Sequence, residues 1–124
     1  MAKKHDDFGR LLIMLSTLDQ EQLLDQFISE ISEERFYEAH ESLEAIWFPR
    51  RFEENDEIKL LKGFINAAVS FELIKRGRKD SSKKVWKNYL KYRPLLYKIQ
   101  SPHLNKYHFI ARHVESINNK KNIF

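Results

Sequence analysis

A histidine among acidic residues is the clearest chemical signal in the sequence. His40 stands in the run Glu38-Ala39-His40-Glu41, and Glu44 follows four positions later. Residues four apart lie on the same face of a helix, so His40 and Glu44 can pair there. An imidazole paired with a carboxylate is a proton-transfer unit, and both side chains are also ligands for metals. The pattern therefore raises two chemical hypotheses, acid–base catalysis and metal binding.

The spacing argues against a metal and leaves catalysis as an alternative. The zinc-protease motif needs a second histidine at the position of Glu44, and carboxylate-bridged dimetal bundles need Glu-x-x-His pairs from two helices, which this chain does not supply. We therefore expect no metal and no cofactor. No nucleophile, glycine-rich phosphate loop or oxyanion arrangement accompanies His40, so His40 and Glu44 remain candidates and no catalytic residue is assigned.

The interpretation that we favour for His40 is structural. A carboxylate would hold one ring nitrogen, and a backbone carbonyl or Asn66 would hold the other, which would fix how two helices dock. A small-ligand pocket next to Trp47 is the remaining interpretation. For either one the candidate binding residues are His40, Glu41, Glu44, Trp47, Asn66 and Glu72.

Glu72 is unusual because it falls in the middle of an apolar helix face. A buried carboxylate without a partner would be very costly. It must be paired, be protonated, or reach water near the helix end. Arg76, four residues later, is the expected partner.

The elements that position these residues are predicted to be helices. Scarce glycine and proline (three of each) favour long helices. Asp19, Asn55 and Ser101 are expected N-terminal caps, and Gly77 an expected C-terminal stop. Apolar spacing predicts helices at about 7–16, 20–32, 34–48, 56–76, from Asp80 or Ser81 to Pro94, and from Ser101-Pro102 onward, with residues 118–124 frayed.

Helix 56–76 is predicted to be the buried centre because it is apolar over most of its circumference. Gly63, Ala67 and Ser70 are small, so another helix can approach closely there. We therefore predict an all-α fold, a single bundle of five to six helices around this central helix, in one domain spanning residues 1–124.

Composition excludes several classes of protein. The chain has no cysteine, which excludes disulfides, thiolate zinc sites and a cysteine nucleophile. It has no run of 18 apolar residues and no secretory signal at its N-terminus. We expect a soluble cytoplasmic protein that does not enter the membrane.

Charge is distributed unevenly along the chain. Residues 1–57 have a net charge of −9 and residues 58–124 a net charge of +13, which gives the +4 of the whole chain. The halves can face each other in the fold, two copies can pair as a homo-oligomer, or an acidic protein or nucleic acid can bind the basic half. Plain solvated surface is the remaining explanation.

The basic residues of the fifth predicted helix form one stripe. Trp86, Tyr89 and Tyr92 interleave with this stripe, and basic residues with aromatics can bind phosphates and stack bases. Alternatively the aromatics turn into the core and the lysines face solvent. The basic face consists of Lys83, Lys84, Lys87 and Lys91.

Two blocks of the sequence resemble the signature of the domain-of-unknown-function family 309, whose members are small all-helical proteins. Glu38-Ala39-His40-Glu41, Glu44 and Trp47 resemble its first block, and the segment 61–68 with Gly77 resembles its second. The resemblance covers about residues 34–92. Asn66 stands where the family usually has Gln, Glu72 where many members have His, and Arg78 replaces an Asn. The resemblance implies a helical fold and no settled activity.

The leading hypothesis is therefore a non-enzymatic interaction or scaffold module. It would use the basic face or a groove lined by Trp47, Phe48 and Phe52. The first alternative is an enzyme or small-ligand-binding protein centred on His40 and Glu44. The second alternative is nucleic-acid binding through the basic face.

Overall fold

The computed structural model of the chain describes residues 19–121, and every regular element within that range is helical. This confirms the predicted all-α class. The helix predicted at 7–16 lies outside the described residues. The elements are α2 (Gln20–Ser32), α3 (Phe36–Trp47), the 3₁₀ helix η1 (Phe48–Arg50), α4 (Asp56–Lys75), α5 (Lys79–Tyr92), the 3₁₀ helix η2 (Arg93–Tyr97) and α6 (Leu104–Lys120).

Two helices begin at the polar caps that the sequence predicted. The Asp19 carboxylate accepts the Gln22 backbone N–H at 2.8 Å, and the Gln22 side chain accepts the Asp19 N–H at 3.0 Å. The Asn55 side chain accepts the Glu57 N–H at 2.8 Å at the start of α4. Side-chain oxygens at these positions satisfy amides that the first helical turn leaves without partners.

The predicted boundaries of α6 were wrong at both ends. The Ser101 hydroxyl accepts the His103 N–H at 3.0 Å, but this bond closes a turn, and the helix begins only at Leu104. At the other end α6 remains helical through Lys120, and Asn118 is buried instead of frayed.

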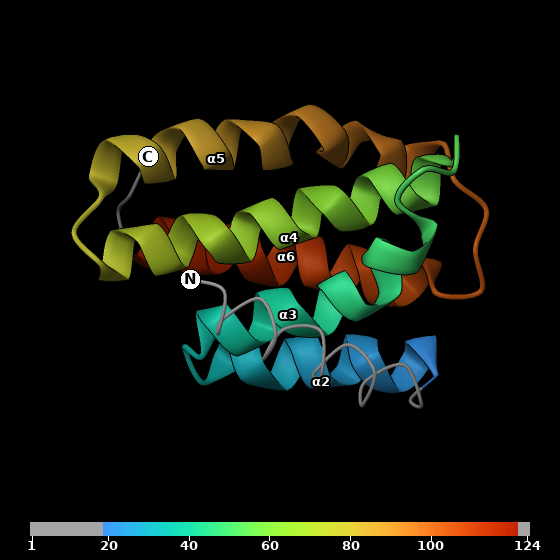
Figure 1. Cartoon of the computed structure of the whole chain (residues 1–124), viewed down its shortest axis with the longest axis horizontal. Helices are drawn as coiled ribbons and strands as arrows, with labels where there is room; N and C mark the ends of the chain where they lie inside the picture. Colours follow the sequence, from blue (N-terminus) through green and yellow to red (C-terminus); the bar gives the residue numbers. More distant parts are fainter. Residues whose placement is uncertain (1–18, 122–124) are drawn as a thin grey trace.

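α4 lies at the centre of the bundle, as predicted. In Figure 1, α5 lies on one side of it, α3 and then α2 lie on the other, and α6 lies behind it. The buried residues of α4 therefore point in several directions. Leu60, Leu61, Phe64 and Phe71 are all without solvent exposure.

α5 approaches α4 closely along the small residues of α4. A Cβ built on Gly63 would lie 2.9 Å from the Cβ of Tyr92, which is closer than real Cβ contacts come. Further along, the Ser82 hydroxyl donates to the Ser70 carbonyl at 2.7 Å. The absence of side-chain bulk at Gly63 thus sets the separation between these two helices.

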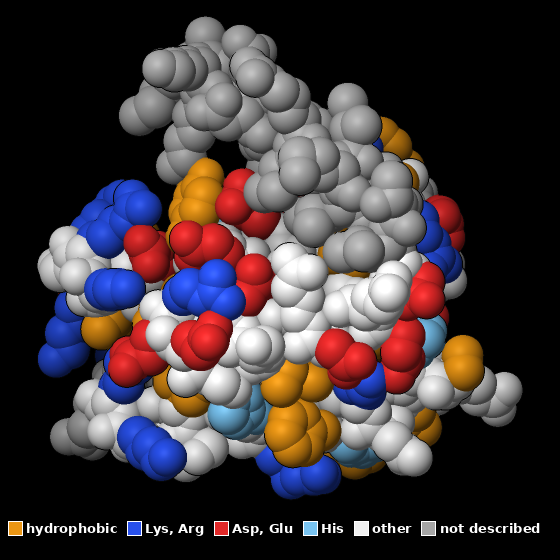
Figure 2. All heavy atoms as spheres, turned by 90° about the horizontal axis from the view of Figure 1, so that it is seen from below, with side chains coloured by type: hydrophobic (Ala, Val, Ile, Leu, Met, Phe, Trp, Pro, Cys, Tyr) orange, Lys and Arg blue, Asp and Glu red, His pale blue; other side chains and the backbone are white. Residues whose placement is uncertain are grey.

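Part of the uneven charge is neutralised inside the fold. Lys106 of α6 pairs with Glu21 and with Asp25 of α2, and Lys121 contacts the Glu34 carboxylate at 2.7 Å. Figure 2, which views the molecule from the side of α2, shows acidic and basic side chains lying together on this face. Pairing between copies of the chain stays a prediction.

Candidate functional site

His40 makes both of its hydrogen bonds within its own helix. Its Nδ1 lies 2.8 Å from the Tyr37 carbonyl oxygen, which can only accept, and its Nε2 lies 3.2 Å from a Glu44 carboxylate oxygen. Burial lowers the pKa of His40, but the bonds to Glu44 and to the Tyr37 carbonyl outweigh it, and the pKa is raised above its usual value. The expected pairing with Glu44 is confirmed.

Two partners were predicted for the other ring nitrogen of His40. The backbone carbonyl is confirmed, since Tyr37 supplies it, and the alternative bond to Asn66 does not form. The Asn66 amide donates instead to the Lys62 carbonyl of its own helix at 2.7 Å. Partners one turn away in a helix are close whatever the packing, whereas a bond across helices depends on their separation. His40 therefore orients side chains on α3 and does not tie α3 to α4 by a hydrogen bond.

Glu72 has the partner that the sequence predicted. Its carboxylate lies 2.8 Å from the Nε of Arg76, and its side chain is 19% exposed. The ion pair lies at the last turns of α4, where the Arg76 side chain reaches solvent. Glu72 is therefore a partly buried, paired carboxylate.

The other two candidate residues of α3 have different surroundings. Glu41 is buried and lines neither of the two hollows described next. Trp47 is half-buried, and the Lys62 ammonium lies 4.2 Å from the centre of its ring. That distance is within the range of a cation–π contact.

Partly exposed side chains of α3 and α4 form two adjacent stripes. Tyr37, His40, Glu44 and Trp47 make the α3 stripe, and Lys62, Asn66, Val69 and Leu73 make the α4 stripe. A hollow lies at each end. We call the one at His40 the histidine hollow and the one at Trp47 the tryptophan hollow; their volumes are about 200 and 400 Å³.

The tryptophan hollow combines aromatic side chains with cations. It is lined by Trp47, Phe52 and Tyr92 together with Arg51, Lys59 and Lys62, among others. Phe52 is 85% exposed. The Arg51 guanidinium lies 3.8 Å from the Phe48 ring centre and 4.5 Å from that of Phe52. Sequence reasoning anticipated Trp47 and Phe52 here but missed Tyr92, because nothing in the spacing places α5 beside η1.

The chain matches the family described as Domain of unknown function (DUF309) over residues 24–85, which is half of its length. It belongs to this family. The matched segment of this DUF309 chain runs from α2 into α5 and contains every lining residue of both hollows except Tyr92. No curated protein and no solved structure matches the chain.

The basic face of this DUF309 member points to solvent, and two of the three aromatic residues beside it do not. Lys83, Lys84, Lys87 and Lys91 are exposed, whereas Trp86 and Tyr89 are buried with their rings 4.7 Å apart. Bases could not stack on those two rings without opening the core. Binding of nucleic acid to the lysines remains an untested prediction.

Two buried tyrosine clusters of this DUF309 chain went unpredicted. The Tyr107 hydroxyl donates to Glu57 at 2.5 Å and accepts from the Gln20 amide at 2.7 Å. The Tyr89 hydroxyl donates to Glu115 at 2.5 Å. Burial, reinforced by the neighbouring carboxylate, raises the pKa of both tyrosines far above its usual value, so both stay protonated donors. No sequence spacing relates residues so far apart.

Among residues 19–121 no three histidine, aspartate or glutamate side chains converge as metal ligands would. None of the described helices is long and apolar enough to cross a bilayer.

Proposed function

We propose that this DUF309 chain is a non-enzymatic binding module whose tryptophan hollow takes an apolar side chain from an acidic protein segment. The exposure of Phe52 is the observation that carries this proposal. Water-exposed phenylalanine beside further aromatic rings is typical of interaction surfaces, where burial of aromatic side chains supplies much of the binding energy. Phe52 is 85% exposed in the free chain.

The charge around the hollow supports an acidic partner. Arg51, Lys59 and Lys62 line it, and of its two acidic lining residues Glu53 pairs with Arg50, at 3.1 Å, and Glu54 with Lys59, at 4.0 Å. Beyond Tyr92 lie the exposed lysines of α5. Among the described residues, none of the ion pairs uses Lys83, Lys84 or Lys87, so these charges remain open to a partner.

The geometry of His40 supports binding over catalysis. Both ring nitrogens are engaged by atoms of α3. A general base needs a nitrogen within hydrogen-bond reach of the substrate proton, and here Glu44 and the Tyr37 carbonyl occupy both positions.

The proposal is tested with fluorescently labelled polymers of defined chemistry. The probe is a random copolymer of glutamate and tyrosine, the control is polyglutamate, and binding is followed by fluorescence anisotropy at low and high salt. We expect the copolymer to bind more tightly than polyglutamate. Phe52→Ser should weaken copolymer binding by about tenfold, equivalent to about 1.4 kcal/mol.

Phe109→Ser is the matched control, since Phe109 is also an exposed phenylalanine, 45% exposed, but lies on α6. It should leave the affinity unchanged. Equal effects of the two substitutions, or equal binding of both polymers, would refute the proposal. A labelled single-stranded oligonucleotide that binds more tightly than the copolymer would favour nucleic-acid binding instead.

A further inference from the structure

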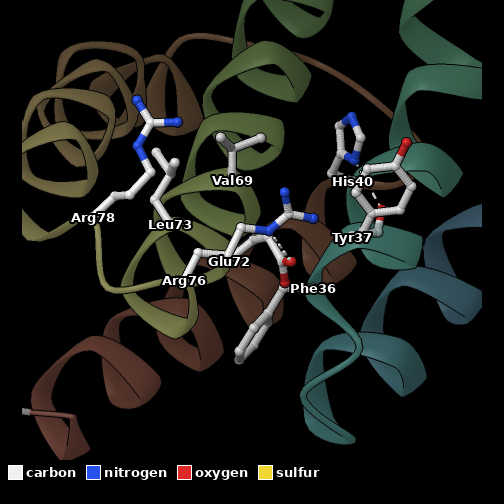
Figure 3. Close-up of a pocket in the computed structure, with 8 residues that line it drawn as sticks. All are labelled: Phe36, Tyr37, His40, Val69, Glu72, Leu73, Arg76 and Arg78. Carbon is white, nitrogen blue, oxygen red and sulfur yellow. Dashed lines mark hydrogen bonds and ion pairs between the residues drawn. The ribbon is translucent and has the colours of Figure 1, made fainter. Parts of the chain in front are cut away.

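The histidine hollow is a second concave site, at the opposite end of the two stripes. It lies between α3, the last turns of α4 and the turn into α5 (Figure 3). Its volume of about 200 Å³ is below the range typical of drug-sized ligands, about 300–1,000 Å³. It therefore suits a molecule no larger than a single ring with one substituent.

The walls of the hollow are mainly apolar. Phe36 and Tyr37 close it from α3, and Val69 and Leu73 close it from α4. Water held between such walls has few hydrogen-bond partners, so its replacement by an apolar group is favourable. The shape and the walls thus favour a hydrocarbon ring.

The rim of the hollow carries two arginines from one short turn. Arg76 and Arg78 flank Gly77, whose φ of +77° reverses the chain. The Gly77 N–H donates to the Ile74 carbonyl at 2.9 Å and the Arg78 N–H to the Leu73 carbonyl at 2.8 Å. These two bonds form the usual glycine termination of a helix, so the backbone that carries both arginines is fixed.

Each guanidinium has donors left for a ligand. Glu72 holds Arg76 through Nε, and within the described part of the chain the two terminal amino groups of Arg76 donate to no other residue. Among these residues the Arg78 guanidinium donates one hydrogen bond, to the Ser81 hydroxyl at 3.4 Å. By binding Nε, the Glu72 carboxylate orients the two terminal amino groups of Arg76. Those two groups match the spacing of the two oxygens of a carboxylate ligand.

We propose that the histidine hollow binds a small aromatic carboxylate, with the ring between α3 and α4 and the anionic group on Arg76 and Arg78. The lining of the hollow contains two guanidinium groups and one carboxylate, Glu72, so the hollow has an excess of positive charge. His40 stands on the opposite wall, where its partners Glu44 and Tyr37 fix the ring orientation. This site does not depend on the tryptophan hollow, and either proposal can fail alone.

Benzoate is the probe, and benzamide and acetate are its controls. Benzamide has the ring without the charge, and acetate the charge without the ring. We expect benzoate to bind with a dissociation constant on the order of 1 mM, as befits so small a ligand, and both controls to bind at least about tenfold more weakly. Saturation-transfer and amide-shift NMR titrations measure the affinities and locate the shifts.

Three substitutions test the location. Arg78→Ala should weaken benzoate by about tenfold, and Val69→Phe should abolish binding by filling the hollow while leaving every charge in place. Arg112→Ala is the matched control, an exposed arginine on α6, and should change nothing. Thermal unfolding verifies that each variant is folded, and Val69→Phe avoids any loss of an ion pair.

Several results would overturn this assignment. They are the absence of benzoate binding, benzamide binding as tightly as benzoate, wild-type affinity in Val69→Phe, or equal losses in Arg78→Ala and Arg112→Ala. Phe52→Ser should retain wild-type affinity for benzoate, which distinguishes this site from the tryptophan hollow.

Discussion

Replacing Gly63 by alanine tests the packing that places the tryptophan hollow between α4 and α5. In an exposed helix interior this change stabilises a protein by about 1 kcal/mol, because alanine has the higher helix propensity. Here the new Cβ would meet the Tyr92 Cβ at 2.9 Å. No rotamer of Tyr92 can move that atom, so α5 itself must shift. Overpacking of this kind costs about 1–3 kcal/mol.

We therefore expect Gly63→Ala to lower the free energy of unfolding by about 1 kcal/mol, instead of raising it by the same amount. Urea titration followed by far-UV circular dichroism measures the change. For a chain of this size about 1 kcal/mol corresponds to a shift in Tm of roughly 3–6 °C. Tyr92→Gly removes the opposing Cβ, so in the double variant the cost of Gly63→Ala should disappear.

A stabilised Gly63→Ala variant would refute this reasoning, because it would mean that α4 and α5 do not touch at Gly63. Additive effects in the double variant would refute it as well. Coupled effects are expected only between residues in direct contact.

Three further substitutions test the stability of the same fold. The pKa of His40 is raised in the fold, so its pairing stabilises the fold at pH values below the usual pKa of histidine. This contribution is lost as the pH rises through the folded-state pKa. In urea titrations His40→Gln should therefore cost on the order of 1 kcal/mol more at about pH 5.5 than at about pH 8. Tyr107→Phe removes one buried hydrogen bond to the Glu57 carboxylate, which keeps the Ser101 hydroxyl as a donor at 2.8 Å, and should cost about 1 kcal/mol. Tyr97→Phe, at a residue 70% exposed, should cost almost nothing by the same titration. Gly77→Ala should cost about 1–2 kcal/mol by thermal unfolding although no atom lies within 4 Å of the new Cβ, because its φ of +77° is unfavourable for alanine; an unchanged Tm would contradict this.

Most features that depend on neighbours in sequence were predicted well, the cap at Ser101 being an exception. Asp19 and Asn55 cap helices because the amides that they satisfy are two or three residues away. Glu72 pairs with Arg76 because residues four apart share a helix face. The central position of α4 follows from its apolar circumference, which only several neighbours can bury.

Features that depend on how helices meet were not predicted. The Tyr107 hydroxyl donates to Glu57, which is 50 residues away in the sequence. Tyr92 of α5 and Trp47 of α3 line the same hollow. A backbone carbonyl or Asn66 was expected to hold the second ring nitrogen of His40. The Tyr37 carbonyl of the same helix does so, and Asn66 bonds within α4 instead. Helix spacing and rotation decide such contacts, and neither is encoded in the periodicity of a single segment.

The order in which helices pair has a kinetic consequence. α2 packs against α3, α3 against α4 and α4 against α5, so most of the bundle grows by adding each helix to the one before it. Contacts between helices that follow one another in sequence favour folding within microseconds to milliseconds. α6 is the exception, since its Lys106 reaches back 85 residues to Glu21. We therefore expect α6 to dock last during folding and to detach first during unfolding, while α2 to α5, which carry both hollows, stay packed together.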